Sequence, residues 1–572
     1  MAEQGSPAPP ESDRLDSWKE IAAYLGKYER TVRRWEVAEG LPVHRHRHSG
    51  GATVYASKSE IEVWLANRSQ TAQMAAPRRI PISAAIWGII ALVAFASAAA
   101  WFFYLGPARY SASRPTLAVL PFVNLSGNPA DEFFSDGLTE EIISQVSEIG
   151  SGRIWVIART SSMSYKGKTK RIDEIGRELG ANFLLEGSVR KEGERLRISA
   201  QLIKVKDQTH IWSQNYDRSA REIFAVQEEV CREIAARIRG ALPGSTLASH
   251  AGPHAPDPQA YELYLKGLHL MNTPSRESIT KAIEFFQRAA DKDPEYASAH
   301  AALAFSRFAM AWWGYATFKE TMPLTLVAAR RALTLDPDNA RALMIVAESQ
   351  LAFDRKWDAA LPLTRRSVEL QPSDAFLRVI HADALLMANH HDEAVRQLEM
   401  VQKLDPLSLW AQTYSAMLLG MMRRTDEAIA ASRKVLEYDP DNLHARWVLA
   451  VNLTHKGRYD EAIAEFLRRK VPTASTNWAL GYTYGLAGHR DEARRILDFL
   501  LDLSHRQYIV PEFVAIQYIG LGDNGKALDI LEKAVAEFEA GYMYRARTDP
   551  MFDRLRNEPR FQALLARLNL PK

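Results

Sequence analysis

Four side chains that could bind an anion or a base edge lie close together in the segment 29–39. Its polar face carries Arg30, Thr31, Arg33 and Arg34, whereas Val32 and Trp35 lie three residues apart and can anchor it to a neighbour. The preceding segment has apolar residues at helical spacing and ends at a glycine: Trp18, Ile21, Ala22, Leu25 and Gly26. Two short helices joined by a glycine-containing turn, the second rich in arginine, fit the major groove of DNA.

Three histidines alternate just after this segment, at His44, His46 and His48. Alternation in a strand places the three imidazoles on one face, where they could bind zinc. No fourth ligand is visible, and a hairpin that faces DNA explains the basic character of the stretch. We therefore predict that the chain has no metal site.

The remaining sequence offers little for catalysis or for a cofactor. It has no phosphate-binding loop, no nucleophile elbow and no cysteine cluster. Asp136 and Glu140 lie one helical turn apart, but a helix dipole favours acids at its N-terminus, so we interpret them as structural. The single cysteine, Cys231, excludes an internal disulfide and has no evident base beside it. We predict no enzyme activity and no cofactor.

The elements around the arginines resemble a known DNA-binding family. A hairpin is expected over 41–55, and Ser57 with Glu60 forms a capping box for a third helix. The order resembles the MerR/excisionase type of DNA-binding domain, on the words Trp18-Lys19-Glu20-Ile21-Ala22, Thr31-Val32-Arg33-Arg34-Trp35-Glu36, Tyr55 and Ser59-Glu60-Ile61-Glu62-Val63-Trp64-Leu65. The resemblance implies that Thr31, Arg33 and Arg34 approach bases or phosphates, and that Arg45 and Arg47 hold the DNA backbone.

A charge-free run of 25 residues, 82–106, separates this N-terminal part from the rest. At about 1.5 Å per residue a helix of this length spans a bilayer of about 30 Å. Arg78 and Arg79 precede the run and four aromatic residues end it, so we expect the N-terminus in the cytoplasm. The sequence thus predicts a single pass through the inner (cytoplasmic) membrane, with the C-terminal portion extracytoplasmic; whether the anchor is cleaved stays open.

The region 115–242 shows strand and helix signals in the order β-α-β-α-β-β-β, followed by a last helix over 223–238. This order predicts an α/β sandwich. Four words resemble the TolB amino-terminal-like domain: Leu117-Ala118-Val119-Leu120-Pro121-Phe122, Phe134-Ser135-Asp136-Gly137-Leu138-Thr139-Glu140-Glu141, Leu185-Glu186-Gly187-Ser188-Val189 and Ile211-Trp212-Ser213-Gln214-Asn215-Tyr216-Asp217. That family implies a module without chemistry of its own, found beside adenylate-cyclase domains and in membrane-bound regulators.

A period of 34 residues marks the C-terminal half. It is set by Pro372, Pro406 and Pro440, and by Asp358, Asp392, Asp426 and Asp460. This period, with small residues where two helices cross, is the tetratricopeptide signature, and we predict seven to eight repeats over 258–542. Stacked repeats leave a concave groove. Four aromatic residues on the first helices of their repeats are the candidate partner contacts: Trp410, Trp447, Trp478 and Tyr482.

The predicted fold class is multidomain and mainly α, with a winged helix-turn-helix head, a single transmembrane helix, an α/β sandwich and an α-solenoid. The expected boundaries are 1–13 disordered, 14–68 DNA-binding domain, 69–81 linker, 82–106 transmembrane helix, 115–242 TolB-like domain, 243–257 linker, 258–542 repeats and 543–572 a C-terminal capping helix. The formal net charge of +3 over 572 residues excludes a globally basic protein. A nucleic-acid role therefore needs a local basic patch.

Two functional hypotheses follow. In the first, the chain is a one-component transcription regulator, similar in layout to the ToxR-type membrane-bound regulators. Its partners are then double-stranded DNA, the membrane and an unknown protein or peptide in the repeat groove, with a homodimer possible. In the second, it is an envelope scaffold whose head is only a cytoplasmic interaction module. Salt-dependent binding of duplex DNA by the head separates the two.

Overall fold

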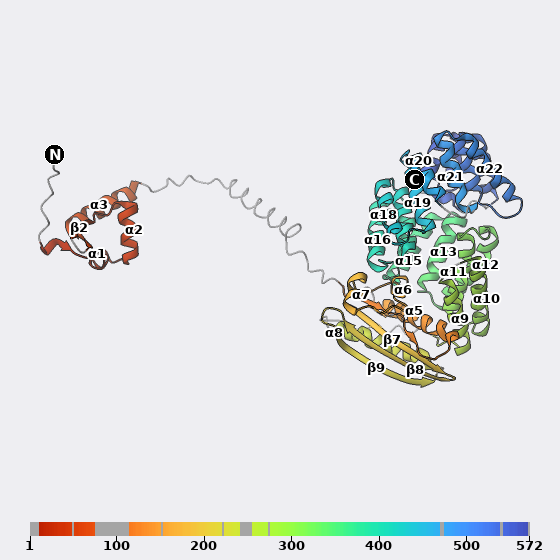
Figure 1. The fold of residues 1–572 in the computed structure, drawn as a ribbon, viewed down its shortest axis with the longest axis horizontal. Coiled ribbons are helices and arrows are strands. Elements are labelled where there is room, and N and C mark those ends of the chain that lie inside the picture. The colour runs from red at the N-terminus through yellow and green to blue at the C-terminus, as the bar shows by residue number, and fades with distance from the viewer. Residues whose placement is uncertain are drawn as a thin grey trace. The chain divides into compact units, whose positions relative to one another are not determined.

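The computed structural model describes residues 11–48, 51–74, 114–149, 153–219, 222–240, 254–272, 275–468, 474–537 and 542–569. The chain divides into two compact units, unit 1 over Met1–Ser111 and unit 2 over Ala112–Lys572. Each unit is described by itself (Figure 1).

The described part of unit 1 contains three α-helices, one 3-10 helix and a small antiparallel sheet. Its elements are η1 Glu11–Asp13, β1 Arg14–Leu15, α1 Trp18–Tyr24, α2 Glu29–Glu39, β2 His44–His48, β3 Gly51–Ser57 and α3 Lys58–Met74. The sheet order is β1-β3-β2. The helix expected over 29–39 is confirmed, and Gly40 ends it in the left-handed conformation at φ 67°. Ile21, Val32, Trp35, Ala56 and Ile61 form the buried core that joins the helices to the sheet.

The predicted fold class is wrong in including a transmembrane helix, as far as the structure describes the chain. Across the described ranges, no helix combines the length and the apolar character that a bilayer crossing needs. The predicted span itself, 82–106, lies outside the described residues. The mainly α character of the chain is confirmed.

Unit 2 begins with an α/β layer. Its elements are β4 Thr116–Val119, β5 Val123–Asn124, η3 Pro129–Asp131, α5 Glu132–Ile149, β6 Trp155–Val156, α6 Arg159–Met163, α7 Ile172–Leu179, β7 Phe183–Glu192, β8 Arg195–Lys204, β9 Thr209–Ser219 and α8 Ile223–Gly240. The sheet order is β6-β4-β7-β8-β9, with β5 also paired to β7. The strands β4, β6 and β7 run parallel, whereas β7, β8 and β9 are antiparallel.

Both faces of this sheet are covered where β4 lies. Leu117 and Val119 belong to one apolar cluster with residues of α5 and α8. Ala118 and Leu120 belong to a second cluster with residues of α7. Because successive side chains of a strand point to opposite faces, both sets of β4 residues are buried, which explains why the strand reads as a continuous apolar run.

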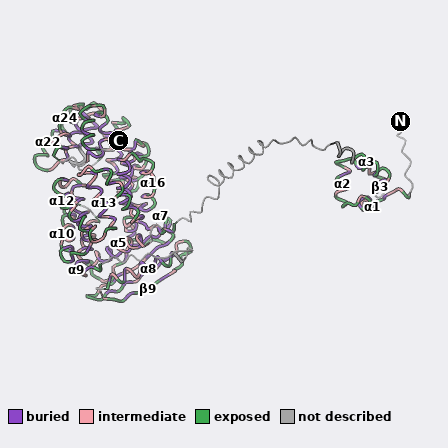
Figure 2. The backbone as a smooth tube through the Cα atoms, turned by 180° about the vertical axis from the view of Figure 1, so that it is seen from behind, coloured by how far each residue is buried: buried purple, intermediate pink, exposed green. Residues whose placement is uncertain are grey.

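Helical hairpins follow in pairs of antiparallel helices. The bounds are α9 Pro258–Met271, α10 Arg276–Lys292, α11 Ala297–Trp312, α12 Phe318–Leu335, α13 Ala340–Ser349, η5 Gln350–Asp354, α14 Trp357–Leu370, α15 Ala375–Met387, α16 His391–Leu404, α17 Leu409–Met421, α18 Thr425–Tyr438, α19 Leu443–His455, α20 Tyr459–Leu467, α21 Ala474–Ala487, α22 Arg490–Ser504, α23 Pro511–Leu521 and α24 Asn524–Ala536. Alanines that lie twelve residues apart on the two helices of a hairpin, such as Ala416 and Ala428, are fully buried. Figure 2 shows buried positions along the helices of the repeats. Small side chains therefore allow the helices of a hairpin to pack closely.

The sequence predicts a single capping helix for the C-terminal segment, but the structure shows several short helices there. The segment contains two 3-10 helices, η6 Met543–Arg545 and η7 Pro550–Leu555, and the short helix α25 Pro559–Arg567. Pro550 occupies the first turn of η7, where its missing N–H costs no hydrogen bond. This segment returns along the repeats and contacts helices more than 100 residues away.

Candidate functional site

The candidate DNA-binding surface is the outward face of α2. Val32 and Trp35 on its opposite face are buried, so the helix is fixed to the unit 1 core. Arg30 and Arg34 are exposed, and neither makes an ion pair with a described residue. Thr31 lies half-buried between the two faces. Two guanidinium groups are therefore free to contact phosphate or base edges.

Arg33 and Arg45 are held within unit 1. The Arg33 guanidinium lies 5.1 Å from the centre of the Trp18 ring, and its Nη2 lies 3.7 Å from a carboxylate oxygen of Glu29. Arg45 on β2 pairs with Glu36 on α2, with 2.6 Å between Nη1 and Oε1. This pair ties the hairpin to α2. Both arginines remain more than half exposed.

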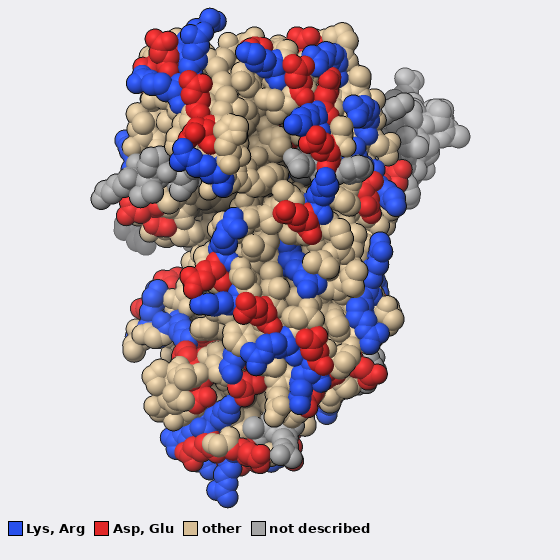
Figure 3. All heavy atoms as spheres, turned by 90° about the vertical axis from the view of Figure 1, so that its right-hand side faces the viewer, with Lys and Arg blue, Asp and Glu red and all other residues tan. Residues whose placement is uncertain are grey.

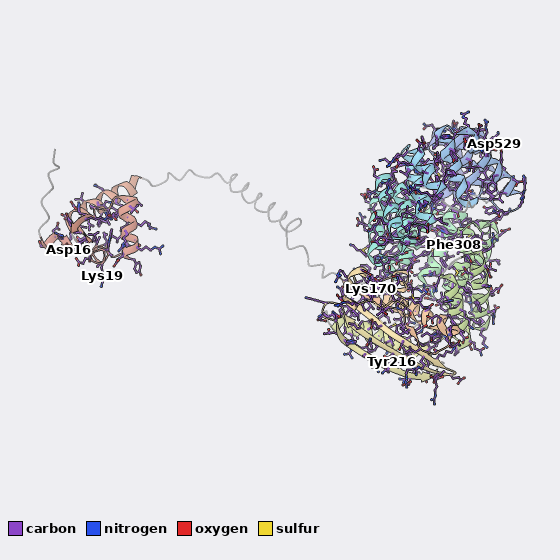
Figure 4. All side chains as sticks on the ribbon, in the orientation of Figure 1. Asp16, Lys19, Lys170, Tyr216, Phe308 and Asp529 are labelled. Atoms are coloured by element: carbon purple, nitrogen blue, oxygen red, sulfur yellow. The ribbon has the colours of Figure 1, made fainter. Side chains whose placement is uncertain are left out.

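The remaining residues of the predicted site lie in the hairpin. Arg47 is part of β2, but its side chain is outside the described residues, as are the side chains of His46 and His48. The Nε2 atom of His44 lies 2.8 Å from Oε2 of Glu60 on α3. Within the described part of the chain, no group of three His, Cys, Asp or Glu residues could hold a metal ion. Figure 4 labels Asp16 and Lys19 at the start of α1.

Unit 2 shows no comparable basic surface on the face drawn in Figure 3, where Lys and Arg side chains mix with Asp and Glu side chains. Attraction of nucleic acid depends on a patch of one sign. On the described residues, the head is therefore the better candidate for contact with DNA than this face of the repeats.

The inner surface of the repeats is covered by the chain's own C-terminal segment. Arg545 donates to the Asp383 carboxylate on α15 and to the Tyr414 hydroxyl on α17. The Tyr542 hydroxyl donates to the Trp312 carbonyl at 2.6 Å, and Arg547 donates to the Met387 carbonyl at 2.6 Å. These partners lie on first helices of their hairpins. The groove expected to receive a partner is thus filled at this level.

The four aromatic residues proposed as partner contacts pack against other helices. Trp478 and Tyr482 are only 5% and 4% exposed. Trp478 stacks on Phe513 at 4.5 Å between ring centres, and Trp410 stacks on Phe376 at 5.4 Å. Trp447 is half-buried. A partner would reach Trp478 or Tyr482 only if the neighbouring helices moved.

A buried acidic cluster beside Arg545 was not foreseen from the sequence. Burial, and to a smaller extent the nearby Asp383, raise the pKa of Glu348 on α13 to about 8. Its Oε2 atom is buried and has no hydrogen-bond partner among the described residues. The sequence does contain one indication of this cluster, because Asp383 is the one charged residue in the otherwise apolar stretch Ala382–Met387 of α15.

The α/β layer is joined to the repeats by buried hydrogen bonds. The Asp405 carboxylate accepts from the Ser161 backbone N–H at 3.1 Å and from its hydroxyl at 2.7 Å. The Ala158 N–H donates to the Leu404 carbonyl at 2.7 Å. Asp136 and Glu140, the two acids one helical turn apart, each form an ion pair within the α/β layer. Asp136 pairs with Lys166, and a carboxylate oxygen of Glu140 lies 3.3 Å from Nε of Arg159.

Comparison with known proteins identifies two regions. The HilA/YgeH-like transcriptional regulator family, second domain, matches residues 112–233. A tetratricopeptide repeat family matches residues 415–475. The first match covers the α/β layer and not the head. Two resemblances therefore stay predictions: that of the head to MerR/excisionase domains and that of the α/β layer to the TolB amino-terminal-like domain.

Two curated relatives share part of the chain. A Rhizobium meliloti protein named "Putative adenylate cyclase 3" is 37% identical over 251 residues, which are 43% of this chain and 42% of that protein. The transcriptional regulator HilA of Salmonella typhimurium is 21% identical over 291 residues, 51% of each chain. The chain thus spans about half or less of the length of these relatives.

Solved structures with helical repeats are more distant. The human IFIT1 dimer has a TM-score of 0.39 at 15% identity, over 55% of this chain and 77% of that one. Yeast Tom70 has a TM-score of 0.34 at 14% identity, over 61% of this chain and 82% of that one. Likenesses at this level carry no functional inference. The chain carries a HilA-like transcriptional regulator domain over 112–233 and tetratricopeptide repeats at its C-terminal side.

Proposed function

We propose that the protein is a transcription regulator that binds double-stranded DNA through α2 and the β2–β3 hairpin, and that binds a protein or peptide through its repeats. The observation that carries the DNA part is the outward face of α2, where Arg30 and Arg34 are exposed and unpaired among described residues while Val32 and Trp35 are buried. The presence of a HilA-like regulator domain in the same chain supports this role.

The site residues divide by how readily they reach DNA. Arg30 and Arg34 need no rearrangement. Arg33 and Arg45 must exchange a carboxylate within unit 1 for a phosphate, which lowers the net gain from each contact. We therefore propose that Arg30 and Arg34 contribute most to affinity, with Thr31 beside them as a hydroxyl donor and Arg45 and Arg47 as backbone contacts from the hairpin.

The repeats supply the partner-binding part of the proposal. Tetratricopeptide repeats suit proteins or peptides because stacked hairpins present an extended surface. Since residues 542–547 cover the inner surface around Asp383, the partner contacts other parts of the solenoid or displaces this segment. No reaction is proposed.

The test is the salt dependence of DNA binding by the purified full chain. Fluorescence anisotropy with a labelled mixed-sequence duplex is measured from about 50 to 200 mM salt. The double variant Arg30→Ala with Arg34→Ala is expected to bind more weakly and to reduce the slope of log K against log salt by about 2. The matched control is Arg433→Ala with Arg494→Ala, two exposed arginines on α18 and α22 without an ion pair to a described residue.

The control removes the same charge from unit 2 and should leave the slope unchanged. A full chain that shows no salt-dependent binding to duplex DNA would refute the regulator proposal and leave the head as a protein-interaction module. Equal effects of the two double variants would show that binding is not located on α2.

A further inference from the structure

The two edges of the six-stranded sheet in unit 2 differ in how they are covered. The edge strand β6 has two residues, and the repeats cover it: the Val156 N–H donates to the Ser373 hydroxyl at 3.1 Å. The other edge strand, β9, has eleven residues, Thr209–Ser219, of which ten pair on one side with β8 and Ile211 is left as the extra residue of a bulge. Figures 1 and 2 show β9 at the margin of unit 2.

The outer side of β9 has no strand beside it among the residues that the structure describes. In that same set, no backbone hydrogen bond links His210 through Arg218 to a segment other than β8. The strand is exposed at five of its central and C-terminal positions, Ser213, Gln214, Asn215, Asp217 and Arg218. A row of N–H and C=O groups is thus presented to a further strand.

Beyond a bulge near its start, β9 lacks the features that usually prevent edge pairing. Natural edge strands are blunted by proline, lysine, bulges or a covering element. β9 contains neither proline nor lysine, and no Asp, Glu or Arg occurs between His210 and Tyr216. Its one irregularity in pairing with β8 is the bulge at Ile211, which lies between the pairs His210–Ile203 and Trp212–Leu202. From Trp212 to Arg218 the pairing with β8 is regular.

The strand is also compatible with a copy of itself. A two-fold axis normal to the sheet keeps each side chain on its own face, so residues of equal parity must pair in an antiparallel arrangement. With the axis at Gln214, residues 212–216 pair with residues 216–212 of the partner subunit. Trp212 then faces Tyr216 of the partner subunit, and Ser213 faces Asn215 of the partner subunit.

The paired stretch 212–216 contains no charged side chain, so this register opposes no two carboxylates and no two guanidinium groups. Asp217 and Arg218 lie just beyond it, next to the bulge at Ile211 of the partner subunit. The aromatic pair lies next to the core, because Trp212 and Tyr216 belong to the main apolar cluster of unit 2 and are 7% and 2% exposed. Figure 4 labels Tyr216 on β9. Cross-strand aromatic pairs are among the stabilising pairs of antiparallel sheets.

We propose that β9 is a dimerisation edge that pairs with β9 of a second copy of this chain, with the axis at Gln214. The sheet then runs continuously through both copies. The dimer itself does not depend on DNA binding. A dimer would carry two DNA-binding heads and could therefore bind two half-sites of an operator. This consequence rests on the proposed function.

The axis residue allows a test by charge complementation. In this register Gln214 faces Gln214 of the partner subunit, so Gln214→Lys places two ammonium groups on directly opposed positions, about 5 Å apart at Cβ. Gln214→Glu does the same with carboxylates. Sedimentation equilibrium of the full chain is expected to show a dimer, with dissociation constants for Q214K and for Q214E raised roughly tenfold or more. An equimolar mixture of the two variants is expected to regain the affinity of the unsubstituted chain.

Gln562→Lys on the exposed face of α25 is the matched control and should dimerise like the unsubstituted chain. Circular dichroism checks the fold of each variant, and regained affinity in the mixture cannot arise from misfolding. An unsubstituted chain that stays monomeric up to about 100 μM, a concentration above most specific dimer constants, overturns the proposal. So does a Q214K or Q214E variant that dimerises normally, or a folded mixture that stays monomeric. Loss of DNA binding by a dimeric protein would instead refute only the proposed function.

Discussion

Arg545 near the C-terminus and Asp383 on α15 form an ion pair that is almost fully buried, with 8% and 2% of their side chains exposed. The Tyr544 hydroxyl also donates to the Asp383 carboxylate, at 3.2 Å. The pair joins the last segment of the chain to the middle of the repeats. Since ions are costly to remove from water, each member depends on the other.

We expect the two residues to be energetically coupled. Asp383→Ala or Arg545→Ala should each lower the free energy of unfolding of unit 2 by roughly 3–5 kcal/mol, because either leaves a buried charge without its partner. The double variant should cost much less than the sum. Urea unfolding followed by circular dichroism gives the double-mutant cycle.

The contrast for this cycle is the half-exposed pair Arg423–Asp553, which also joins the terminal segment to the repeats. Arg423→Ala should have a smaller effect, because water screens the pair. Additive effects of Asp383→Ala and Arg545→Ala would contradict the coupling.

The Glu348 carboxyl should make stability depend on pH. Burial, with Asp383 nearby, raises its pKa from 4.5 to about 8, so the native state holds the proton where the unfolded state has lost it. The contribution of this group therefore declines as the pH rises from about 4.5 to about 8. Glu348→Gln keeps a neutral side chain of similar shape and removes the decline.

The difference between the two proteins is the measured quantity. Relative to the unsubstituted chain, E348Q should gain on the order of 3 kcal/mol between pH 5.5 and 8.5. The other buried acids contribute equally to the pH dependence of both proteins, so their contributions cancel in the difference. Asp405 is one of them, and burial raises its pKa to about 6. A pH-independent difference between the two proteins would show that Glu348 does not titrate in this range.

Local periodicity accounts for what the sequence predicted well. The helix Glu29–Glu39 follows from Val32 and Trp35 on one face and arginines on the other. The spacing of 43 residues between Pro294 and Pro337, against 34 in later repeats, indicates a longer helix or an insertion, and α11 and α12 have 16 and 18 residues. In both cases the structure depends on neighbours within a few turns.

Contacts between distant segments account for what the sequence did not predict. The segment from Tyr542 to Leu555 has no helical period, and its path is set by hydrogen bonds to Trp312, Asp383 and Met387. The pairing of Arg45 with Glu36 likewise depends on how the hairpin folds back on α2. Periodicity describes one element, whereas these features depend on two.

The junction between the α/β layer and the repeats should loosen when Ser161 is changed. Its hydroxyl donates to Asp405 and also accepts from the Leu407 N–H at 2.9 Å. Ser161→Ala leaves both groups short of a partner in a buried place, at a cost of roughly 1–3 kcal/mol. Hydrogen exchange of the amides of residues 155–163 and 404–408 should become faster by the corresponding factor.

Ser164→Ala is the matched control, because among the described residues the Ser164 hydroxyl donates to the Ser161 carbonyl at the end of α6 and makes no hydrogen bond to the repeats. It should leave exchange at residues 404–408 unchanged. If the amides of residues 404–408 exchange at the same rate in the Ser161→Ala and Ser164→Ala variants, the junction does not depend on the Ser161 hydroxyl.

Release of Arg45 from Glu36 should strengthen DNA binding. Glu36→Gln removes the carboxylate that holds the Arg45 guanidinium at 2.6 Å, so this arginine reaches a phosphate without first losing a partner. We expect the affinity for duplex DNA to rise about two- to fivefold, and to fall when Arg45→Ala is made alone. The double variant Glu36→Gln with Arg45→Ala separates this mechanism from a general loss of negative charge. If the gain requires Arg45, the double variant binds no better than Arg45→Ala; an equal gain in both backgrounds would mean that Glu36 acts only by repelling DNA.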